Sequence, residues 1–208
     1  MSSAEDIKNT TVKEVLNSSF WLMPATPKFK DSGVIYITSK NLKNGVIDFS
    51  DVKYISESDY EKVSANRPVY PGDILISMIG TIGQIAVVED DAPDFYGQNI
   101  YLLRLNDERI NRRFFCEFIR ADSTQSIFQG TRNGSTQSYL KANHIEDLNI
   151  QLPRIQVQEQ FAAFCEQSDK SKFDCRMASN LNLSRCLLTK GILPNLEKSS
   201  LSFQAENS

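Results

Sequence analysis

The sequence predicts a mixed α/β globular domain followed by a long C-terminal α-helix. Short segments rich in β-branched and aromatic residues, such as 33–38 and 74–78, alternate with turn residues and predict a sheet. The 208 residues are 40% hydrophobic and 24% charged, which is enough apolar material for a core. After Gln156 there is no glycine until Gly191 and no proline until Pro194, as expected for a long helix.

The N-terminal part predicts a short helix, three strands and a second helix. Thr11 precedes Glu14 by three residues, the capping-box pattern of a helix start. A loop with two prolines and two lysines follows. Residues 33–38 then predict a strand, and the turn NLKNG at 41–45 contains the Asn-Gly pair that favours positive φ. Short strands at 46–49 and 52–55 and a helix at 56–64, capped by Ser58, complete this part.

The central part predicts a hairpin-like unit. Residues 74–78 and 85–88 are apolar and β-prone, and Gly80 and Gly83 break the run between them. An acidic turn at 89–94 precedes another strand at 98–105. Residues 111–123 then predict a helix, 129–137 a polar loop, and 148–153 an edge strand that ends at a proline. The helix carries one apolar side, formed by Phe114, Phe115, Phe118 and Ile119.

These segments divide the chain into a globular domain at 1–155, a long helix at 156–193 and a polar tail at 194–208. The helix has no uniform apolar stripe. One face, formed by Phe161, Phe164 and Cys165, is expected to pack on the globular part. The other face needs a partner helix, unless the helix folds back on its own domain, and the poor heptad pattern favours helix pairing over an ideal coiled coil. This pairing face comprises Phe173, Met177, Leu181, Leu188 and Ile192.

The composition predicts a non-catalytic, cytoplasmic protein without metal or cofactor. No apolar run reaches the ~20 residues of a membrane helix, and the N-terminus lacks the apolar region of a signal peptide. Four scattered cysteines form no CxxC, so we expect them to be reduced and structural. The single histidine, His144, is expected to be bonded near a strand, and no phosphate-loop, dinucleotide or hydrolase motif occurs.

Five segments, in this order and at this spacing, resemble the target-recognition domain of type I restriction–modification specificity subunits. The resemblance covers about residues 10–193. The segments are TPKFKDSGVIYITSKNLKNG (26–45), PGDILISMIGTIGQIAVV (71–88), GQNIYLLRL (97–105), GTRNGSTQSYL (130–140) and HIEDLNIQLPRIQVQEQ (144–160).

The resemblance implies a subunit that recognises double-stranded DNA and positions partners that carry the chemistry. Those partners are adenine-N6 methyltransferase (M) subunits and a restriction and translocase (R) subunit. A typical member has two recognition domains joined by two antiparallel helices, whereas this chain has one of each. Two copies paired through their helices would recognise a split palindrome, and a different half-subunit would satisfy the helix equally well. The alternative is a truncated or regulatory half that occupies methyltransferase subunits without recognising a site.

Polar turns and loops are the expected DNA contacts, because base edges carry the sequence information and phosphates only position the protein. Each set also has a structural interpretation: the Asn-Gly turn and the two glycines can serve the fold alone. A flanking cluster, Arg112, Arg113 and Arg120, is either a solvated helix face or a phosphate contact. The net charge of −3 restricts any basic contact to a local patch. The predicted contacts are Lys28, Lys30, Lys40, Asn41, Lys43, Asn44, Ser77, Gly80, Thr81, Gly83, Arg132, Asn133, Ser135, Thr136 and Gln137.

Overall fold

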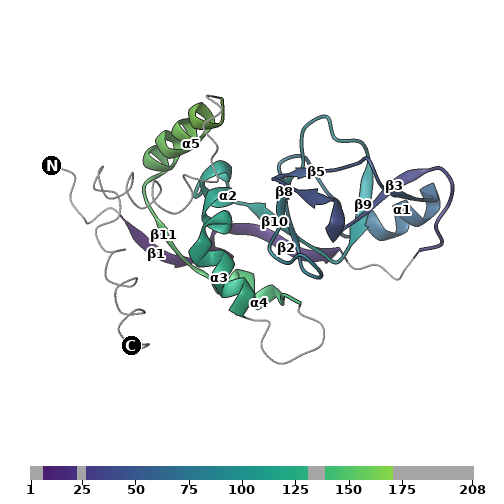
Figure 1. Cartoon of the computed structure of the whole chain (residues 1–208), viewed down its shortest axis with the longest axis horizontal. Helices are drawn as coiled ribbons and strands as arrows, with labels where there is room; N and C mark the ends of the chain where they lie inside the picture. Colours follow the sequence, from purple (N-terminus) through teal and green to yellow (C-terminus); the bar gives the residue numbers. More distant parts are fainter. Residues whose placement is uncertain (1–6, 23–26, 131–138, 171–208) are drawn as a thin grey trace, which may run out of the picture. The chain divides into compact units, whose positions relative to one another are not determined.

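A computed structural model describes residues 7–22, 27–130 and 139–170 of the chain. The chain divides into two compact units, and the larger one, residues 9–151, is called the globular unit below. The smaller unit comprises residues 1–8 and 152–208. The structure contains both α-helices and β-strands, which confirms the predicted mixed α/β class (Figure 1).

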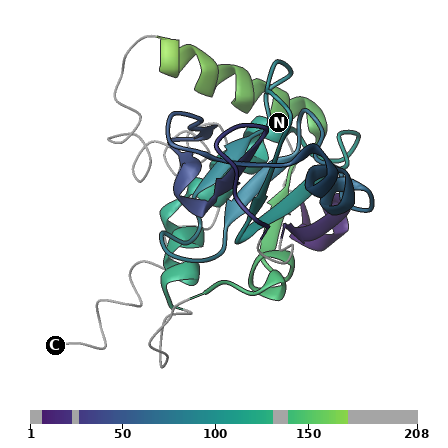
Figure 2. The same ribbon diagram turned by 90° about the vertical axis from the view of Figure 1, so that its right-hand side faces the viewer.

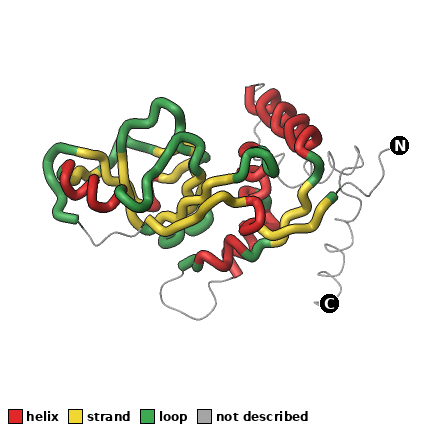
Figure 3. The backbone as a smooth tube through the Cα atoms, turned by 180° about the vertical axis from the view of Figure 1, so that it is seen from behind, coloured by secondary structure: helices red, strands yellow, loops and turns green. Residues whose placement is uncertain are grey.

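A four-stranded antiparallel sheet forms one half of the globular unit (Figure 3). Its strands lie in the order β2 (Leu16–Leu22), β10 (Ile100–Leu105), β7 (Ile74–Ser77) and β8 (Ile85–Val87). Strand β2 was not predicted. It follows a 3₁₀ helix, η2 (Val12–Val15), whose Glu14 carboxylate accepts the Thr11 N–H at 3.0 Å, so the predicted short helix is confirmed. Its polar run Asn17–Ser19 gives no strand signal, and its partner β10 lies about 80 residues away along the chain.

A three-stranded sheet forms the other half, in the order β6 (Lys53–Ile55), β3 (Val34–Thr38) and β9 (Phe95–Gln98). Strand β3 is antiparallel to β6 and parallel to β9. The single strand predicted at 98–105 is wrong at its start. Asn99 has φ 62°, and this left-handed residue separates β9 from β10. The chain therefore leaves one sheet and enters the other at Asn99.

Both sheets contribute side chains to one hydrophobic core. Leu75 and Leu102 enter it from the four-stranded sheet, and Tyr36, Ile37 and Phe95 enter it from the three-stranded sheet. All five side chains are at most 4% exposed. The shared core fixes the two sheets, and the turns at their ends, relative to each other.

Two local predictions can be compared directly with the structure. Asn44 (φ 53°) and Gly45 (φ 91°) form the predicted turn, between β4 (Leu42–Lys43) and β5 (Val46–Ile47). The predicted small helix is α1 (Glu57–Ser64), but its cap is Ser56 and not Ser58. The Ser56 hydroxyl accepts the Asp59 N–H at 3.2 Å, because position 56 is the residue immediately before the first helical turn.

Three helices and an edge strand complete the globular unit (Figure 1). The helix predicted at 111–123 ends earlier, as α2 (Arg112–Arg120), and the unpredicted α3 (Asp122–Gly130) follows it. Residues 129 and 130, predicted as the start of the polar loop, therefore belong to α3, and residues 131–137 of that prediction lie outside the described residues. His144 lies in helix α4 (Ala142–Glu146), and its Nδ1 accepts the Lys141 N–H at 3.2 Å, so it is bonded as expected. Strand β11 (Asn149–Leu152) pairs with β1 (Lys8–Thr11), which confirms the edge strand.

The smaller unit is described only through residue 170, and its main element is α5 (Ile155–Lys170) (Figure 2). Phe161 and Cys165 are buried, but Phe164 is 44% exposed, so the predicted first face is narrower than expected. Residues four apart lie about 40° apart on a helix, whereas Phe164 lies about 100° from Cys165. The predicted pairing face from Phe173 to Ile192 lies outside the described residues. None of the described helices is long and apolar enough to span a membrane.

Candidate nucleic-acid interface

The turn between β7 and β8 is held by Ser77. Its buried hydroxyl donates to the Thr81 carbonyl at 2.5 Å and accepts the Gln84 N–H at 2.9 Å. The Gly83 N–H also donates to the Ser77 carbonyl at 3.0 Å. Ser77 thus acts inside the fold and is 0% exposed, so this predicted DNA contact has no surface to offer. The part of the turn that faces solvent is its tip, where Gly80 and Thr81 are exposed.

The two glycines of this turn have different surroundings. Gly80 has φ 80°, and a Cβ added there would meet only the Ser39 hydroxyl, at 4.0 Å, among the described atoms. Gly83 has φ 79°, and an added Cβ would lie 2.8 Å from the Phe128 ring. The Gln125 amide of α3 also donates to the Gly83 carbonyl at 3.2 Å. Gly83 is therefore required for the packing of α3, whereas Gly80 leaves the tip open.

The end of strand β3 lies beside this tip. Ser39 and Lys40 begin the 3₁₀ helix η3 (Ser39–Asn41), which starts where β3 ends. The Ser39 hydroxyl is the atom next to Gly80, and the Lys40 side chain is exposed. A hydroxyl and an ammonium group thus come to the turn from a segment 40 residues earlier in the chain.

The segment after the polar loop lies along the same turn. Tyr139 and Ile79 form an antiparallel bridge, and the Leu140 N–H donates to the Met78 carbonyl at 2.9 Å. We call the group formed by these three segments the turn surface; its members are exposed except for Ser39, which is half-buried. It comprises Ser39, Lys40, Ile79, Gly80, Thr81 and Tyr139.

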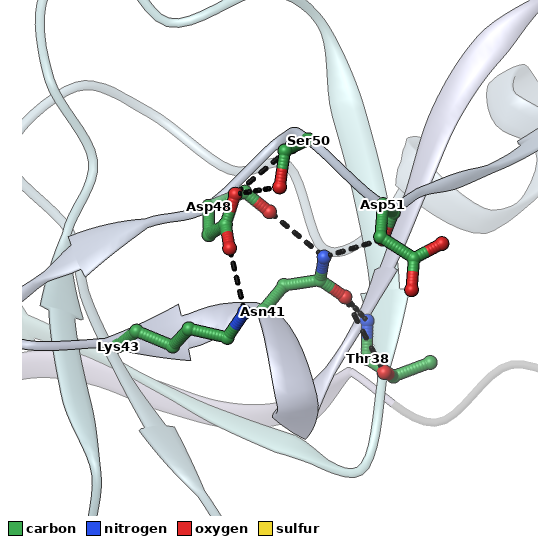
Figure 4. A network of polar contacts seen from close by, with 6 residues as sticks. All are labelled: Thr38, Asn41, Lys43, Asp48, Ser50 and Asp51. Carbon is green, nitrogen blue, oxygen red and sulfur yellow. Dashed lines mark hydrogen bonds and ion pairs between the residues drawn. The ribbon is translucent and has the colours of Figure 1, made fainter.

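Asn41 is part of the fold, as Figure 4 shows. Its amide nitrogen donates to the carbonyls of Asp48 at 2.8 Å and Asp51 at 2.9 Å. Its amide oxygen accepts the Thr38 N–H at 2.9 Å, and the residue is only 6% exposed. Adenine recognition needs both ends of a free carboxamide. The structure therefore corrects the expectation for Asn41, because both ends are used inside the fold.

Lys43 and Asn44 are exposed on the adjoining hairpin. Lys43 Nζ lies 2.6 Å from Asp48 Oδ2. The hydrogen bonds from Lys43 and Ser50 hold the pKa of the Asp48 carboxyl well below its usual range. This pairing balances the Lys43 charge locally, whereas Lys40 has no ion pair among those found in the described residues. The neighbouring Gly45 backbone lies against the Arg120 guanidinium, where an added Cβ would come within 2.2 Å.

Lys28 and Lys30 lie apart from the turn surface. Both are exposed, and Lys30 forms a bridge with Tyr54, which is paired with the first half of β3. Lys40 follows the opposite end of that strand. Phe29, which separates Lys28 from Lys30 in the sequence, packs on Tyr36 with ring centroids 5.7 Å apart. The structure thus separates the predicted contacts into two places.

The arginines of α2 are engaged within the chain. Arg113 and Arg120 both pair with Glu117, at 3.1 Å and 2.8 Å, and Arg112 lies 3.9 Å from Asp107. These ion pairs favour the interpretation of the cluster as a structural helix face. The predicted contacts from Arg132 to Gln137 lie outside the described residues. In the described part of the chain, no group of His, Cys, Asp and Glu residues could hold a metal ion.

Two clusters of hydrogen-bonded polar side chains, which the sequence did not predict, hold elements that carry or adjoin the turn surface. Arg104 of β10 forms two bonds to the buried Asp73 carboxylate, from Nε at 2.8 Å and from an η nitrogen at 2.7 Å. Glu146 of α4 accepts the hydroxyls of Ser19 at 2.7 Å and Tyr101 at 2.6 Å. The first cluster fixes the start of β7 and the second fixes α4 on the sheet. Asp73 follows Pro71 and Gly72, so the turn dipeptide was the available signal.

Comparisons with known proteins agree with this architecture. The family model of the type I restriction modification DNA specificity domain matches residues 4–181. A structure of the type I R-M system, reported for its complex assembly and conformational transition, superposes with a TM-score of 0.59 at 15% identity, over 82% of this chain and 40% of that one. The HsdS subunit from Thermoanaerobacter tengcongensis gives 0.59 at 16% identity, over 83% and 44%. The S subunit from M. genitalium gives 0.54 at 14% identity, over 79% and 39%.

The similarity to solved structures and the match to the family model support different conclusions. At identities of 14–16%, the three structures show a common fold and no more. The family match covers most of the chain and shows membership. The chain spans about two fifths of the length of the solved chains that it matches.

Proposed function

Because this chain belongs to the family of type I restriction modification DNA specificity domains, we propose that it selects the DNA sites on which a type I restriction–modification complex acts. The observation that carries the proposal is the turn surface. Three segments far apart in sequence meet there, and they present a lysine, three hydroxyls and an open glycine turn. Such groups donate to and accept from base edges and phosphates.

Lys40 is the proposed principal contact of the turn surface. Its exposed ammonium suits guanine O6 and N7 or a phosphate oxygen. Thr81 and Ser39 supply hydroxyls that pair with either donors or acceptors. The open backbone at Gly80 lets a phosphate approach closely. Arg132, Asn133, Ser135, Thr136 and Gln137 remain proposed base contacts, because the described segments on either side of them border the turn surface.

The chemistry belongs to partner subunits in this proposal. M subunits transfer the methyl group to adenine N6, and an R subunit carries out restriction. The chain carries a net charge of −3, so the partner subunits are proposed to supply much of the phosphate contact. The proposed place of action is genomic DNA in the cytoplasm. No cofactor is assigned to this chain.

We further propose that two recognition units act together. The solved chains of this fold are about two and a half times the length matched here. Two copies of this chain, joined through the helix that the sequence predicts at 156–193, would present two turn surfaces to one split palindromic site. Pairing with a different half-subunit would give an asymmetric split site, and a regulatory half would give none.

The test is to co-express the chain with the M subunit of its own system and to map adenine methylation on genomic DNA. A split palindromic motif supports site selection by two identical units. A split asymmetric motif supports a second, different unit. A stable complex without any motif contradicts site selection and supports the regulatory function.

A double substitution tests the contribution of the polar loop. Arg132→Ala with Gln137→Ala is expected to abolish site selection while the subunits still co-purify. If the double variant methylates the same sites at the same rate, the loop does not contact the bases.

A further inference from the structure

Two large side chains whose bulk is apolar are exposed on the turn surface. Ile79 is 37% exposed and Tyr139 is 47% exposed. They are bridge partners in an antiparallel pairing, so their side chains stand next to each other on one face. Neither was among the contacts predicted from sequence. An apolar pair exposed at such a position is the kind of feature that marks a binding site.

The backbone holds this pair in a fixed outward direction. Met78 and Leu140 precede Ile79 and follow Tyr139, and both are 0% exposed. Because successive residues of a strand point to opposite faces, burial of these neighbours turns Ile79 and Tyr139 away from the core. The Leu140 N–H to Met78 carbonyl bond, at 2.9 Å, locks the two segments together. The pair is therefore preorganised and not an accident of a loose loop.

Two parts of a DNA duplex could cover such a pair. Insertion between base pairs requires a base step to be unstacked, at a cost of a few kcal/mol. The thymine C5-methyl group is already exposed in the major groove, and it is the apolar feature of the base edges there. Contact with the methyl group leaves the duplex stacked. The methyl group is therefore the better match for two side chains on a short, stiff turn.

We propose that Ile79 and Tyr139 recognise the C5-methyl group of a thymine within the target site. This inference rests on the proposed function and names one element of its specificity. Gly80 follows Ile79 directly and lies beside the Ser39 hydroxyl, and the exposed Lys40 and Thr81 are the next residues along these two segments. Polar groups that suit base edges and phosphates therefore lie in the same segments as the pair. An A·T pair at one fixed position of each half-site is the consequence.

The experiment uses the complex of the chain with its M subunit and synthetic duplexes that carry the mapped motif. Each thymine of the motif is replaced in turn by deoxyuridine, which removes only the methyl group. Loss of one buried methyl group corresponds to about 0.8 kcal/mol, or about fourfold in affinity. We expect one position at which binding by the wild-type complex weakens about fourfold.

Variants connect that position to the apolar pair. Ile79→Thr keeps the branched shape and Tyr139→Ser removes the ring, and in both we expect the thymine and deoxyuridine duplexes to bind within twofold of each other. Ile79→Val retains the apolar contact and should retain the discrimination. Ile127→Thr is the matched control, since Ile127 is 53% exposed on α3 and is not a residue of the turn surface. Thermal unfolding checks that each variant is folded.

The inference is overturned if no thymine of the motif is sensitive to the replacement. It is equally overturned if the sensitivity survives in both Ile79→Thr and Tyr139→Ser. Neither result affects the proposed function, since the motif and the binding remain. Absence of any motif or DNA binding would instead overturn the proposed function together with this inference.

Discussion

Substitution of Asn41 separates a structural residue from a DNA contact. In the Asn41→Ala variant, the carbonyls of Asp48 and Asp51 and the N–H of Thr38 lose their side-chain partner. A hydrogen bond of this kind contributes about 1 kcal/mol net. Loss of three such bonds predicts a decrease of about 3 kcal/mol in the free energy of unfolding. That is a large fraction of the ~5–15 kcal/mol typical of a domain.

Urea denaturation measures this decrease directly. Trp21 is the single tryptophan of the chain and lies in β2 with its ring 5.9 Å from that of Tyr101, so its fluorescence follows unfolding of the sheet. With a urea dependence of about 1–3 kcal/mol/M, the unfolding midpoint should fall by about 1–3 M. Asn41→Asp should be at least as destabilising, because it faces the same two carbonyls with a carboxylate.

Lys40→Ala is the matched control. Lys40 is the exposed neighbour of Asn41 in η3, so its substitution should leave the free energy of unfolding within about 0.5 kcal/mol of the wild-type value. If Asn41→Ala is as stable as Lys40→Ala and loses site selection, the assignment of Asn41 to the fold is refuted, and its amide contacts DNA.

Three further predictions concern the support of the interface. Gly83→Ala forces a Cβ to within 2.8 Å of Phe128 at φ 79°, so it should destabilise the domain by about 1–3 kcal/mol, whereas Gly80→Ala, with open space, should cost less in the same urea titration. Asp73→Ala leaves Arg104 without its carboxylate and should cost about 3 kcal/mol, and equal stability of the two proteins would show that the ion pair contributes nothing. Burial raises the pKa of Tyr36 and Tyr101 to about 12, with the hydrogen bond to Glu146 contributing at Tyr101. Both groups favour the fold while protonated, so stability should fall as the pH rises from about 10 to 12, and Tyr101→Phe should reduce that fall.

Local patterns in the sequence predicted most of the elements. The strands at Val34–Thr38 and Ile74–Ser77 and the Asn44-Gly45 turn follow from residue preferences within a few positions. Strand β2 could not be found this way, because the polar run Asn17–Ser19 interrupts its strand pattern and its pairing partner, β10, is distant in sequence. The break at Asn99 could not be predicted either, because residue preferences do not show that the chain passes there from β9 in one sheet to β10 in the other.

The candidate site was predictable in part for the same reason. Polarity and turn residues pointed to the 39–44 and 77–83 segments, but they could not separate exposed Lys40 from buried Asn41, or open Gly80 from packed Gly83. That separation depends on neighbours far apart in sequence. Ile79 and Tyr139 were missed because an apolar side chain in a strand-like segment is usually part of the core.

The central claim is that the turn surface selects the DNA site, and one comparison tests it most directly. Adenine methylation is mapped in cells that express the M subunit with either the wild-type chain or the Lys40→Ala, Thr81→Ala double variant. We predict a discrete split motif for the wild type, and a lost or relaxed motif for the variant with the subunits still co-purifying. Methylation of the same sites at the same rate by the two complexes would contradict the claim.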